Sequence, residues 1–230
     1  MDQNHPFRVD PADIDFLYGE WRSLVARQSD GPVDAIFDSL CQLYSAAGRV
    51  YHNLSHVNFL LSSAQSIRKQ LVDYDCVRLA IWFHDAVYDT RSSDNEERSA
   101  ELAEVSLQRF GFSRGMIDSV RDMILATKQH APDDGPPDLG AFLDLDLSIL
   151  GAPEACYGRY SAAIREEYAW VPDAQYRRGR TAILERFLGM ERIYRTEYAN
   201  SRFESQARIN IKNEVAQLIS GPQVRDPQTG

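Results

Sequence analysis

The feature that most constrains this chain is an apolar run that contains a histidine and an aspartate side by side. Residues 77–87 are apolar except for Arg78 and the pair His84-Asp85. Such a run is typical of a helix that is buried on most of its circumference. A buried histidine and carboxylate are costly unless hydrogen bonds, an opposite charge or a metal ion satisfies them. The run therefore predicts a central helix that carries a polar or metal site.

The composition bounds the class of protein. The chain has 230 residues, 43% hydrophobic and 26% charged, which is enough for one sizeable core. A net charge of −9 and the absence of a long basic run argue against a nucleic-acid polymer as the main partner. No apolar run approaches the roughly 18 residues that span a bilayer, and residues 1–6 do not resemble a signal peptide. Cys41, Cys76 and Cys156 form no CxxC pair, which predicts buried, reduced thiols in a cytoplasmic protein.

Helical periodicity dominates the chain, and no segment alternates long enough to predict a strand. We expect a single all-α domain over residues 1–220, with a core at about 33–151 and a helical extension at 152–220. One expected helix contains His56 and continues to residue 71, and another carries His84-Asp85. The other expected helices cover residues 11–28, 33–47, 95–110, 113–130, 139–150, 153–170, 176–198 and 203–219.

Two segments outside the expected helices complete the organisation of the chain. Residues 131–137 form the clearest loop because they combine two aspartates, a glycine and three prolines. By its position alone, this loop is a candidate lid over a site. Residues 221–230 are expected to be a flexible tail. His5 precedes the first helix and receives no role.

Four of the five histidines lie in expected helices or at their edges, namely His52, His56, His84 and His130. His52 and His56 are four residues apart, so they share one face if both are helical. If Asn53 is instead the N-cap, His52 lies just before the helix and points into the same cleft. Either arrangement allows more than one imidazole to reach the His84-Asp85 pair.

Carboxylates accompany these histidines in two further segments. Glu96 and Glu97 fall in the first turn of the helix expected at 95–110, where the helix dipole alone also favours them. Asp144 and Asp146 lie in the apolar helix expected at 139–150. Because they are two residues apart on a helix, they cannot face the same point, and only one should bind a metal directly.

This ordered set resembles the HD superfamily of metal-dependent phosphohydrolases, and in particular a bacterial branch of it. A lone His-Asp pair would be weak, but the order His…His-Asp…Asp is specific. The segments that look similar cover residues 51–56, 82–85, 95–100, 142–151, 164–168 and 178–180, so the resemblance extends over nearly the whole chain. It implies an HD-domain-like helical bundle around a metal site. It also implies hydrolysis of a phosphomonoester or phosphodiester, of a nucleotide or a similar small metabolite.

The metal ligands that the resemblance implies are His56, His84, Asp85 and Asp146. His56 is preferred to His52 because the first ligand of the family begins a helical run. Asp146 is preferred to Asp144 because residues 145–148 resemble a family motif. Successive side chains on a helix diverge by about 100°, so a metal would lie between the directions of His84 and Asp85. Asp85 would then be well placed to bridge a second ion.

Two imidazoles and two carboxylates without thiolate suit Mn, Fe, Ni, Co, Zn or Mg, as one or two ions. Such an ion polarises a phosphoryl oxygen, or lowers the pKa of a bound water to make hydroxide. A likeness to cyclic-nucleotide phosphodiesterases implies that His52 protonates the leaving group and that Glu97, or its neighbour Glu96, orients the hydroxide. The expected catalytic residues are thus His52, Glu97 and Asp85.

Four further side chains are candidates for binding substrate phosphate: Lys128, His130, Arg178 and Arg180. For the arginines at 177–180, a solvated face paired with Glu185 or Glu166 is the favoured explanation. His130 could instead hold a second ion, or be a helix C-terminal residue without a site role.

Simpler roles are open for two other residues. His52 could cap the helix or support a ligand through a hydrogen bond. Asp144 could also support a ligand, or be solvated.

Three other functions remain open at this stage. The chain could be a regulatory module that binds a metal or nucleotide without turnover, or an HD-type di-iron oxygenase, for which only His52 and His130 are spare ligands. It could also be a helical scaffold whose polar core is merely hydrogen-bonded. The favoured interpretation predicts a small phosphorylated substrate, no membrane and no nucleic-acid polymer as partners, and leaves a homo-oligomer open.

Overall fold

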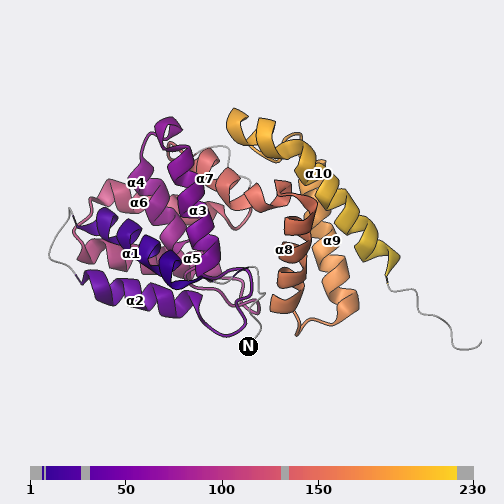
Figure 1. Cartoon of the computed structure of the whole chain (residues 1–230), viewed down its shortest axis with the longest axis horizontal. Coiled ribbons are helices and arrows are strands. Elements are labelled where there is room, and N and C mark those ends of the chain that lie inside the picture. Colours follow the sequence, from indigo (N-terminus) through magenta and orange to yellow (C-terminus); the bar gives the residue numbers. More distant parts are fainter. Residues whose placement is uncertain (1–6, 8, 27–31, 131–134, 222–230) are drawn as a thin grey trace, which may run out of the picture. The chain divides into compact units, whose positions relative to one another are not determined.

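The computed structural model describes residues 7, 9–26, 32–130 and 135–221, and all regular structure in these residues is helical (Figure 1). The expected all-α class is therefore confirmed. The chain divides into two compact units, Met1–Asp146 and Leu147–Gly230. The sequence placed its change from core to extension near residue 151, a few residues later. Residues 131–134 of the candidate lid, residues 222–230 of the tail, and His5 lie outside the described residues.

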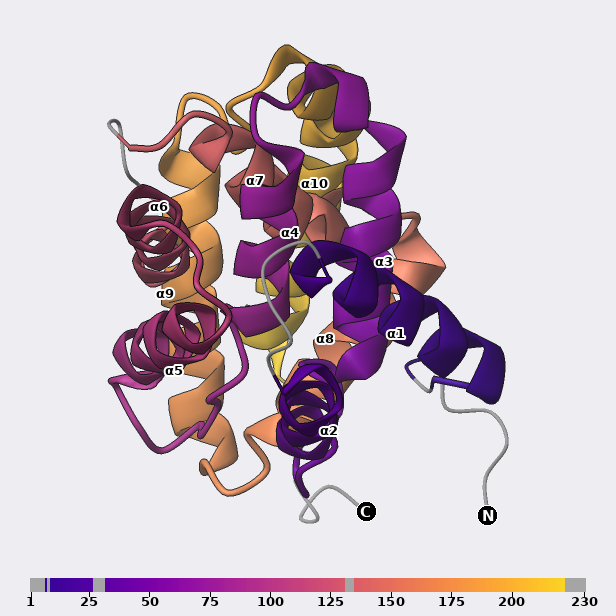
Figure 2. The same cartoon turned by 90° about the vertical axis from the view of Figure 1, so that its left-hand side faces the viewer.

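The first unit contains seven α-helices and one 3₁₀ turn among its described residues. They are α1 (Pro11–Val25), α2 (Val33–Tyr44), α3 (Leu54–Ser66), η1 (Arg68–Gln70), α4 (Tyr74–Phe83), α5 (Asn95–Arg109), α6 (Arg114–Ala126) and α7 (Leu139–Asp146). The helix α4 packs against α1, α3, α5, α6 and α7, and it is the central element of this unit (Figure 2).

The sequence of α4 explains its central place. Asp73 caps the helix by accepting a hydrogen bond from the backbone N–H of Cys76, 3.0 Å away. Every residue from Cys76 to Phe83 is buried, so the expected burial on most of the circumference is confirmed. Even Arg78 is buried, because Glu20 and Asp75 pair with its guanidinium. Trp82 packs edge-on against Trp21, with ring centroids 5.6 Å apart.

The expected position of His84 and Asp85 inside this helix is wrong. The helix ends at Phe83, His84 is the C-cap, and Asp85 follows in a turn. The backbone N–H of Ala86 donates to the carbonyl of Phe83, three residues back, which tightens the chain into this turn. Both side chains therefore lie at the end of a buried helix, where they can point away from its packed face.

The second unit contains η2 (Leu147–Gly151), α8 (Glu154–Glu167), α9 (Asp173–Gly189) and α10 (Glu197–Ser220). The segment η2 packs against α8 and α10. Gly151 permits a close approach to α10, because a Cβ at this position would lie only 2.7 Å from the carbonyl oxygen of Phe203. Asn210 of α10 donates to the carbonyls of Leu150 and Ala152, each at 2.8 Å.

Several expected helix ends differ from the structure. The helix expected at 139–150 is α7 followed by the 3₁₀ segment η2, and the helix expected to reach residue 71 ends at Ser66 before η1. The helix expected at 176–198 is α9, which begins after Pro172 and ends at Gly189. Thr196 then starts α10 six residues before the expected position, because its hydroxyl accepts from the N–H of Ala199.

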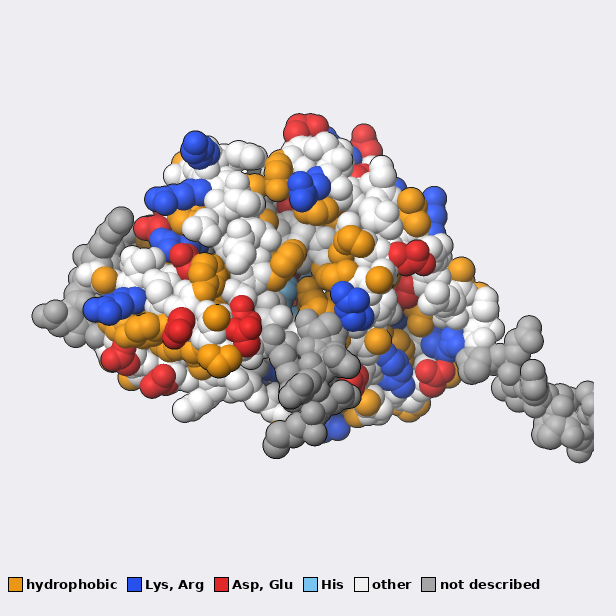
Figure 3. Space-filling view, viewed as in Figure 1, with side chains coloured by type: hydrophobic (Ala, Val, Ile, Leu, Met, Phe, Trp, Pro, Cys, Tyr) orange, Lys and Arg blue, Asp and Glu red, His pale blue; other side chains and the backbone are white. Residues whose placement is uncertain are grey.

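Surface charge, helix hydropathy and the burial of the cysteines can be compared with the expectations from the sequence. Acidic and basic side chains are interspersed on the face that Figure 3 displays. Within the described residues, no helix combines the length and apolar character needed to cross a membrane. All three cysteines are free thiols, but only Cys76 is buried, whereas Cys41 and Cys156 are half-buried. The expectation of three buried thiols is therefore wrong for two of them.

Candidate metal centre

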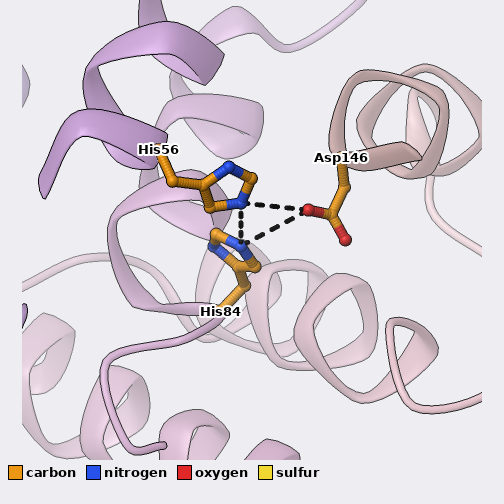
Figure 4. Close-up of side chains that lie close together, drawn as sticks. All are labelled: His56, His84 and Asp146. Atoms are coloured by element: carbon orange, nitrogen blue, oxygen red, sulfur yellow. Dashed lines mark hydrogen bonds and ion pairs between the residues drawn. The ribbon is translucent and has the colours of Figure 1, made fainter. Parts of the chain in front are cut away.

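Three side chains converge inside the first unit, from α3, from the C-cap of α4 and from α7. The Nε2 atom of His56 lies 3.2 Å from the Nε2 atom of His84 and 3.2 Å from Oδ1 of Asp146 (Figure 4). The Nε2 atom of His84 lies 3.7 Å from the same carboxylate oxygen. These three ligand atoms all lie within 4.8 Å of one another. Both histidines are buried, and the carboxylate side chain is 15% exposed.

The start of α3 places His56 in this group. Asn53 is the N-cap, because its side chain accepts from the N–H of Ser55 at 2.8 Å. His56 is therefore in the first turn of the helix, whereas His52 precedes the cap and is not helical. Of the two arrangements that the sequence left open, a shared helical face for His52 and His56 is wrong, and the cap at Asn53 is confirmed.

The end of α4 orients His84. Its Nδ1 atom lies 2.9 Å from the carbonyl oxygen of Ile81. Because a carbonyl can only accept, this nitrogen must carry a proton and donate it. In the neutral tautomer, Nε2 then presents its lone pair to the group, which is the usual arrangement of a metal-binding imidazole. The Nδ1 atom of His56 is buried without a hydrogen-bond partner among the described residues, so no second bond fixes its tautomer.

The two carboxylate oxygens of Asp146 face three histidines. Oδ1 faces His56 and His84, while Oδ2 lies 3.0 Å from Nε2 of His130. His130 follows α6 with a φ of 48°, a left-handed conformation that is strained for a residue with a Cβ. His130 is therefore both a residue beyond a helix C-terminus and a neighbour of the group. Asp144 is buried outside the group of three, which makes the solvated alternative wrong.

Asp85 lies beside this group through one of its members. Its Oδ2 atom is 3.1 Å from Nε2 of His84. Asp85 is not among the three residues whose ligand atoms are mutually close. The structure thus brings together His56, His84 and Asp146 of the four expected ligands, and it places the fourth, Asp85, next to His84.

Burial and neighbouring charges shift the pKa values of these groups in opposite directions. Burial lowers the pKa of His56, so this imidazole favours the neutral form. Burial alone would also lower the pKa of His84, but the carboxylate of Asp85 outweighs it and raises the pKa of His84 to about 9. The pKa values of Asp85 and Asp146 fall below the ordinary range despite their burial, because the histidines face them. Both carboxylates thus stay ionised, which favours a cation in the site.

The donor set and its spacing fit a divalent metal ion. A metal about 2.1 Å from its ligands separates neighbouring ligand atoms by about 3.0 Å in an octahedron and about 3.4 Å in a tetrahedron. The separations of 3.2, 3.2 and 3.7 Å are close to these values. Imidazole and carboxylate ligands without thiolate suit Mn, Fe, Ni, Co, Zn or Mg. His56, His84 and Asp146 would hold the ion, and Asp85 could complete its coordination.

The structure places two of the three expected catalytic residues near this centre. The His52 ring lies 6.0 Å from the His56 ring and 4.4 Å from the ring of Tyr88, centroid to centroid. Asp85 is the neighbour of His84. Glu97 instead forms an ion pair with Lys128, and both side chains are more than a third exposed. Lys128, a candidate phosphate ligand, therefore already has an anionic partner. Its ammonium also lies 4.0 Å from Glu96, the alternative to Glu97.

The two candidate arginines belong to the second unit. Arg178 is exposed on α9. Arg180 is nine-tenths buried and pairs with Glu214, Nε to Oε1 at 2.9 Å, and it also donates to the hydroxyl of Tyr160. The suggested partners Glu185 and Glu166, and the suggestion of a solvated face, are therefore wrong for Arg180. Its charge is already neutralised, which removes the reason for a phosphate-binding role.

One residue that the sequence did not single out supports the centre. Arg49 donates to the backbone carbonyls of His52, Asp85 and Ala86. It precedes His52 by three residues, but Asp85 is 36 residues away in sequence. No local spacing or periodicity marks such a contact, so only the fold reveals it.

Comparison with known proteins adds no relative to this description. A scan against protein-family models, a search of curated proteins and a search of solved structures each find no match. The candidate centre therefore depends on its own residues and their geometry.

Proposed function

We propose that this chain is a metal-dependent phosphohydrolase of the HD type, which cleaves a phosphomonoester or phosphodiester. The observation that carries the proposal is the convergence of three ligand atoms, Nε2 of His56, Nε2 of His84 and Oδ1 of Asp146. The resemblance of the ordered motifs supports the same activity. A core that is only hydrogen-bonded would spread such groups among separate partners, whereas this group brings metal-binding atoms of two imidazoles and a carboxylate to one point.

The proposed metal would be held by His56, His84 and Asp146, with Asp85 beside them. Once bound, a divalent ion supplies Lewis acidity for a phosphoryl oxygen and lowers the pKa of a bound water. The protein contributes the orientation of these ligands. Ile81 fixes the tautomer of His84 through its carbonyl, and His130 holds the second oxygen of Asp146.

His52 is the proposed proton donor to the leaving group. Its ring lies beside that of His56 and against Tyr88, close to the centre but not in the group of three. The Lys128–Glu97 pair gives Glu97 a cation at the start of α5, so we assign it no step. Only His52 and Asp85 therefore remain as proposed catalytic residues.

The substrate we propose is a small phosphorylated metabolite, such as a nucleotide. The net charge of −9 disfavours a nucleic-acid polymer, which repels an acidic surface. The three free thiols are consistent with a cytoplasmic protein.

The test combines metal analysis of the purified protein with a screen for phosphate release. Wild type and Asp146→Ala would be compared on nucleotides and generic phosphoesters, with Mn, Co, Ni, Mg or Zn added. Bound metal and turnover that are both lost in Asp146→Ala support the proposal. Metal without turnover would favour the regulatory module, or oxygen chemistry if the metal is two irons. No metal under any loading condition would refute the centre itself.

A further inference from the structure

The turn that follows α4 contains backbone carbonyls that no further helical turn can satisfy. Side chains satisfy them instead. The hydroxyl of Tyr44 donates to the carbonyl of Trp82 at 3.2 Å, and the hydroxyl of Ser99 donates to that of Val87 at 3.2 Å. The position of His84 and Asp85 therefore depends on residues from other helices.

Arg49 makes the largest contribution to this turn. One terminal nitrogen of its guanidinium donates to the carbonyls of Asp85 at 2.7 Å and of His52 at 2.9 Å. The other donates to the carbonyl of Ala86 at 2.9 Å. A single side chain thus ties the segment before α3 to the segment after α4. Its positive charge also suits the C-terminal end of α4.

The same guanidinium also contacts the aromatic ring that lies against His52. Its carbon Cζ lies 5.0 Å from the centroid of Tyr44 and 5.4 Å from that of Tyr88. The ring of Tyr88 faces His52 at 4.4 Å and an angle of 31°. Arg49 therefore holds His52 twice, through its backbone carbonyl and through the ring that packs on its imidazole.

We infer that Arg49 is a positioning residue, which fixes His52 relative to Asp85 by bonding to the backbone of both. The roles of His52 and Asp85 depend on the proposed function, but the contacts of Arg49 do not. Lysine cannot replace it, because a single ammonium group lacks the planar fork that reaches carbonyls of two segments while it contacts two rings.

The test compares Arg49→Lys with a matched control, Arg208→Lys. Arg208 also donates to three backbone carbonyls, those of Leu188, Met190 and Glu191, but it belongs to the second unit. Three quantities are measured for each variant. They are the Mn²⁺ affinity by calorimetry, kcat and KM for bis(p-nitrophenyl) phosphate with Mn²⁺, and the imidazole proton resonances of His52 by NMR in the metal-free protein.

For Arg49→Lys we expect kcat to fall about 10- to 100-fold, as for other residues that orient a site. Its KM and Mn²⁺ affinity should stay within about threefold, and the His52 resonances should move because the Tyr88 ring is displaced. Arg208→Lys should change none of these. Should Arg49→Lys fold poorly by circular dichroism, Arg49→Ala with added guanidinium serves instead, and the added cation should restore part of kcat.

Two results would overturn the inference: unchanged His52 resonances in Arg49→Lys, or an equal loss of kcat in Arg208→Lys. A wild-type protein that neither binds Mn²⁺ nor hydrolyses the phosphodiester would refute the proposed function. The role of Arg49 would then be decided by the His52 resonances alone.

Discussion

Each unit of the molecule buries a polar group, and the two groups are built on opposite principles. In the second unit, the cation of Arg180 meets the anion of Glu214, and the hydroxyl of Tyr157 also donates to that carboxylate. In the first unit, two imidazole nitrogens and a carboxylate oxygen face one another. The group in the second unit balances its own charge, whereas the group in the first unit gathers atoms that can all bind a cation.

This difference separates a structural polar cluster from a candidate site. Burial would raise the pKa of Glu214, but Arg180 overrides it and keeps that carboxyl ionised, so the pair needs nothing further. The group around His56 instead requires a proton or a metal between atoms that would otherwise repel. Both units therefore bury charged groups, but among the described residues only the group around His56 brings ligand atoms close enough together to hold a metal ion.

The largest expected effect comes from removing a ligand from the group of His56, His84 and Asp146. Asp146→Ala deletes the only carboxylate of the three and should weaken Mn²⁺ binding by at least about 100-fold, with loss of phosphohydrolase turnover. Calorimetry and metal analysis measure the first, and phosphate release measures the second. Glu214→Leu is the control, because it removes a buried carboxylate of the second unit and should leave Mn²⁺ affinity unchanged. Equal losses of affinity in both variants would contradict the distinction between the units.

The second prediction concerns the buried ion pair of Arg180 and Glu214. Glu214→Leu leaves the charge of Arg180 buried without a partner and should lower the free energy of unfolding by about 3–5 kcal/mol. The double variant Glu214→Leu with Arg180→Met removes both charges and should recover most of this loss. Urea unfolding followed by circular dichroism provides the values. A double variant no more stable than Glu214→Leu would show that the network has a role beyond charge balance.

The third prediction uses pH to distinguish protonation of His84 from metal binding at the same group. The pKa of His84 is about 9 in the metal-free fold, against about 6.5 in an unfolded chain. The stabilisation from its protonation is full below pH 6.5 and is lost as the pH rises through 9. Chelator-treated protein should therefore lose unfolding free energy between these values, as measured by urea unfolding. Asp85→Asn should flatten this dependence.

Metal binding should follow pH with the opposite sign. A metal needs the deprotonated imidazole, so Mn²⁺ affinity should increase over the interval in which the metal-free protein becomes less stable. Affinity that falls between pH 6.5 and 9 would argue against His84 as a ligand.

Sequence patterns predicted the all-helical class and the central helix because both depend on local periodicity. The burial of α4 on most of its circumference could be predicted from residues 77–83, since almost every side chain there is apolar. The convergence of His56, His84 and Asp146 could be expected only through their order along the chain. Their separations come from the packing of α3, α4 and α7, which no local pattern contains.

Local patterns failed where backbone conformation or distant partners decide. The exit of the chain from α4 at Phe83 and the left-handed backbone of His130 depend on tertiary packing. Arg180 resembled a surface cation because its sequence neighbours are polar. In the structure it is buried and pairs with Glu214, which is 34 residues later in the sequence. Arg49 carried no signal at all, since its partners are backbone carbonyls, which every residue possesses.

The smallest predicted effect compares two helix caps of the same kind. Asn53 caps α3 in the first unit, and Thr196 caps α10 in the second. Thr196→Ala should lower the unfolding free energy by about 1 kcal/mol, because one N–H at the helix start loses its acceptor. Asn53→Ala should lower it further, because the Asn53 amide also donates to the carbonyls of Phe7 and Val50, at 2.9 and 2.8 Å. Only Asn53→Ala should also weaken Mn²⁺ binding, by several-fold, since His56 lies in the turn that Asn53 caps. Urea unfolding and calorimetry on both variants test this, and an equal loss of affinity in Thr196→Ala would mean that the centre senses general stability rather than the position of α3.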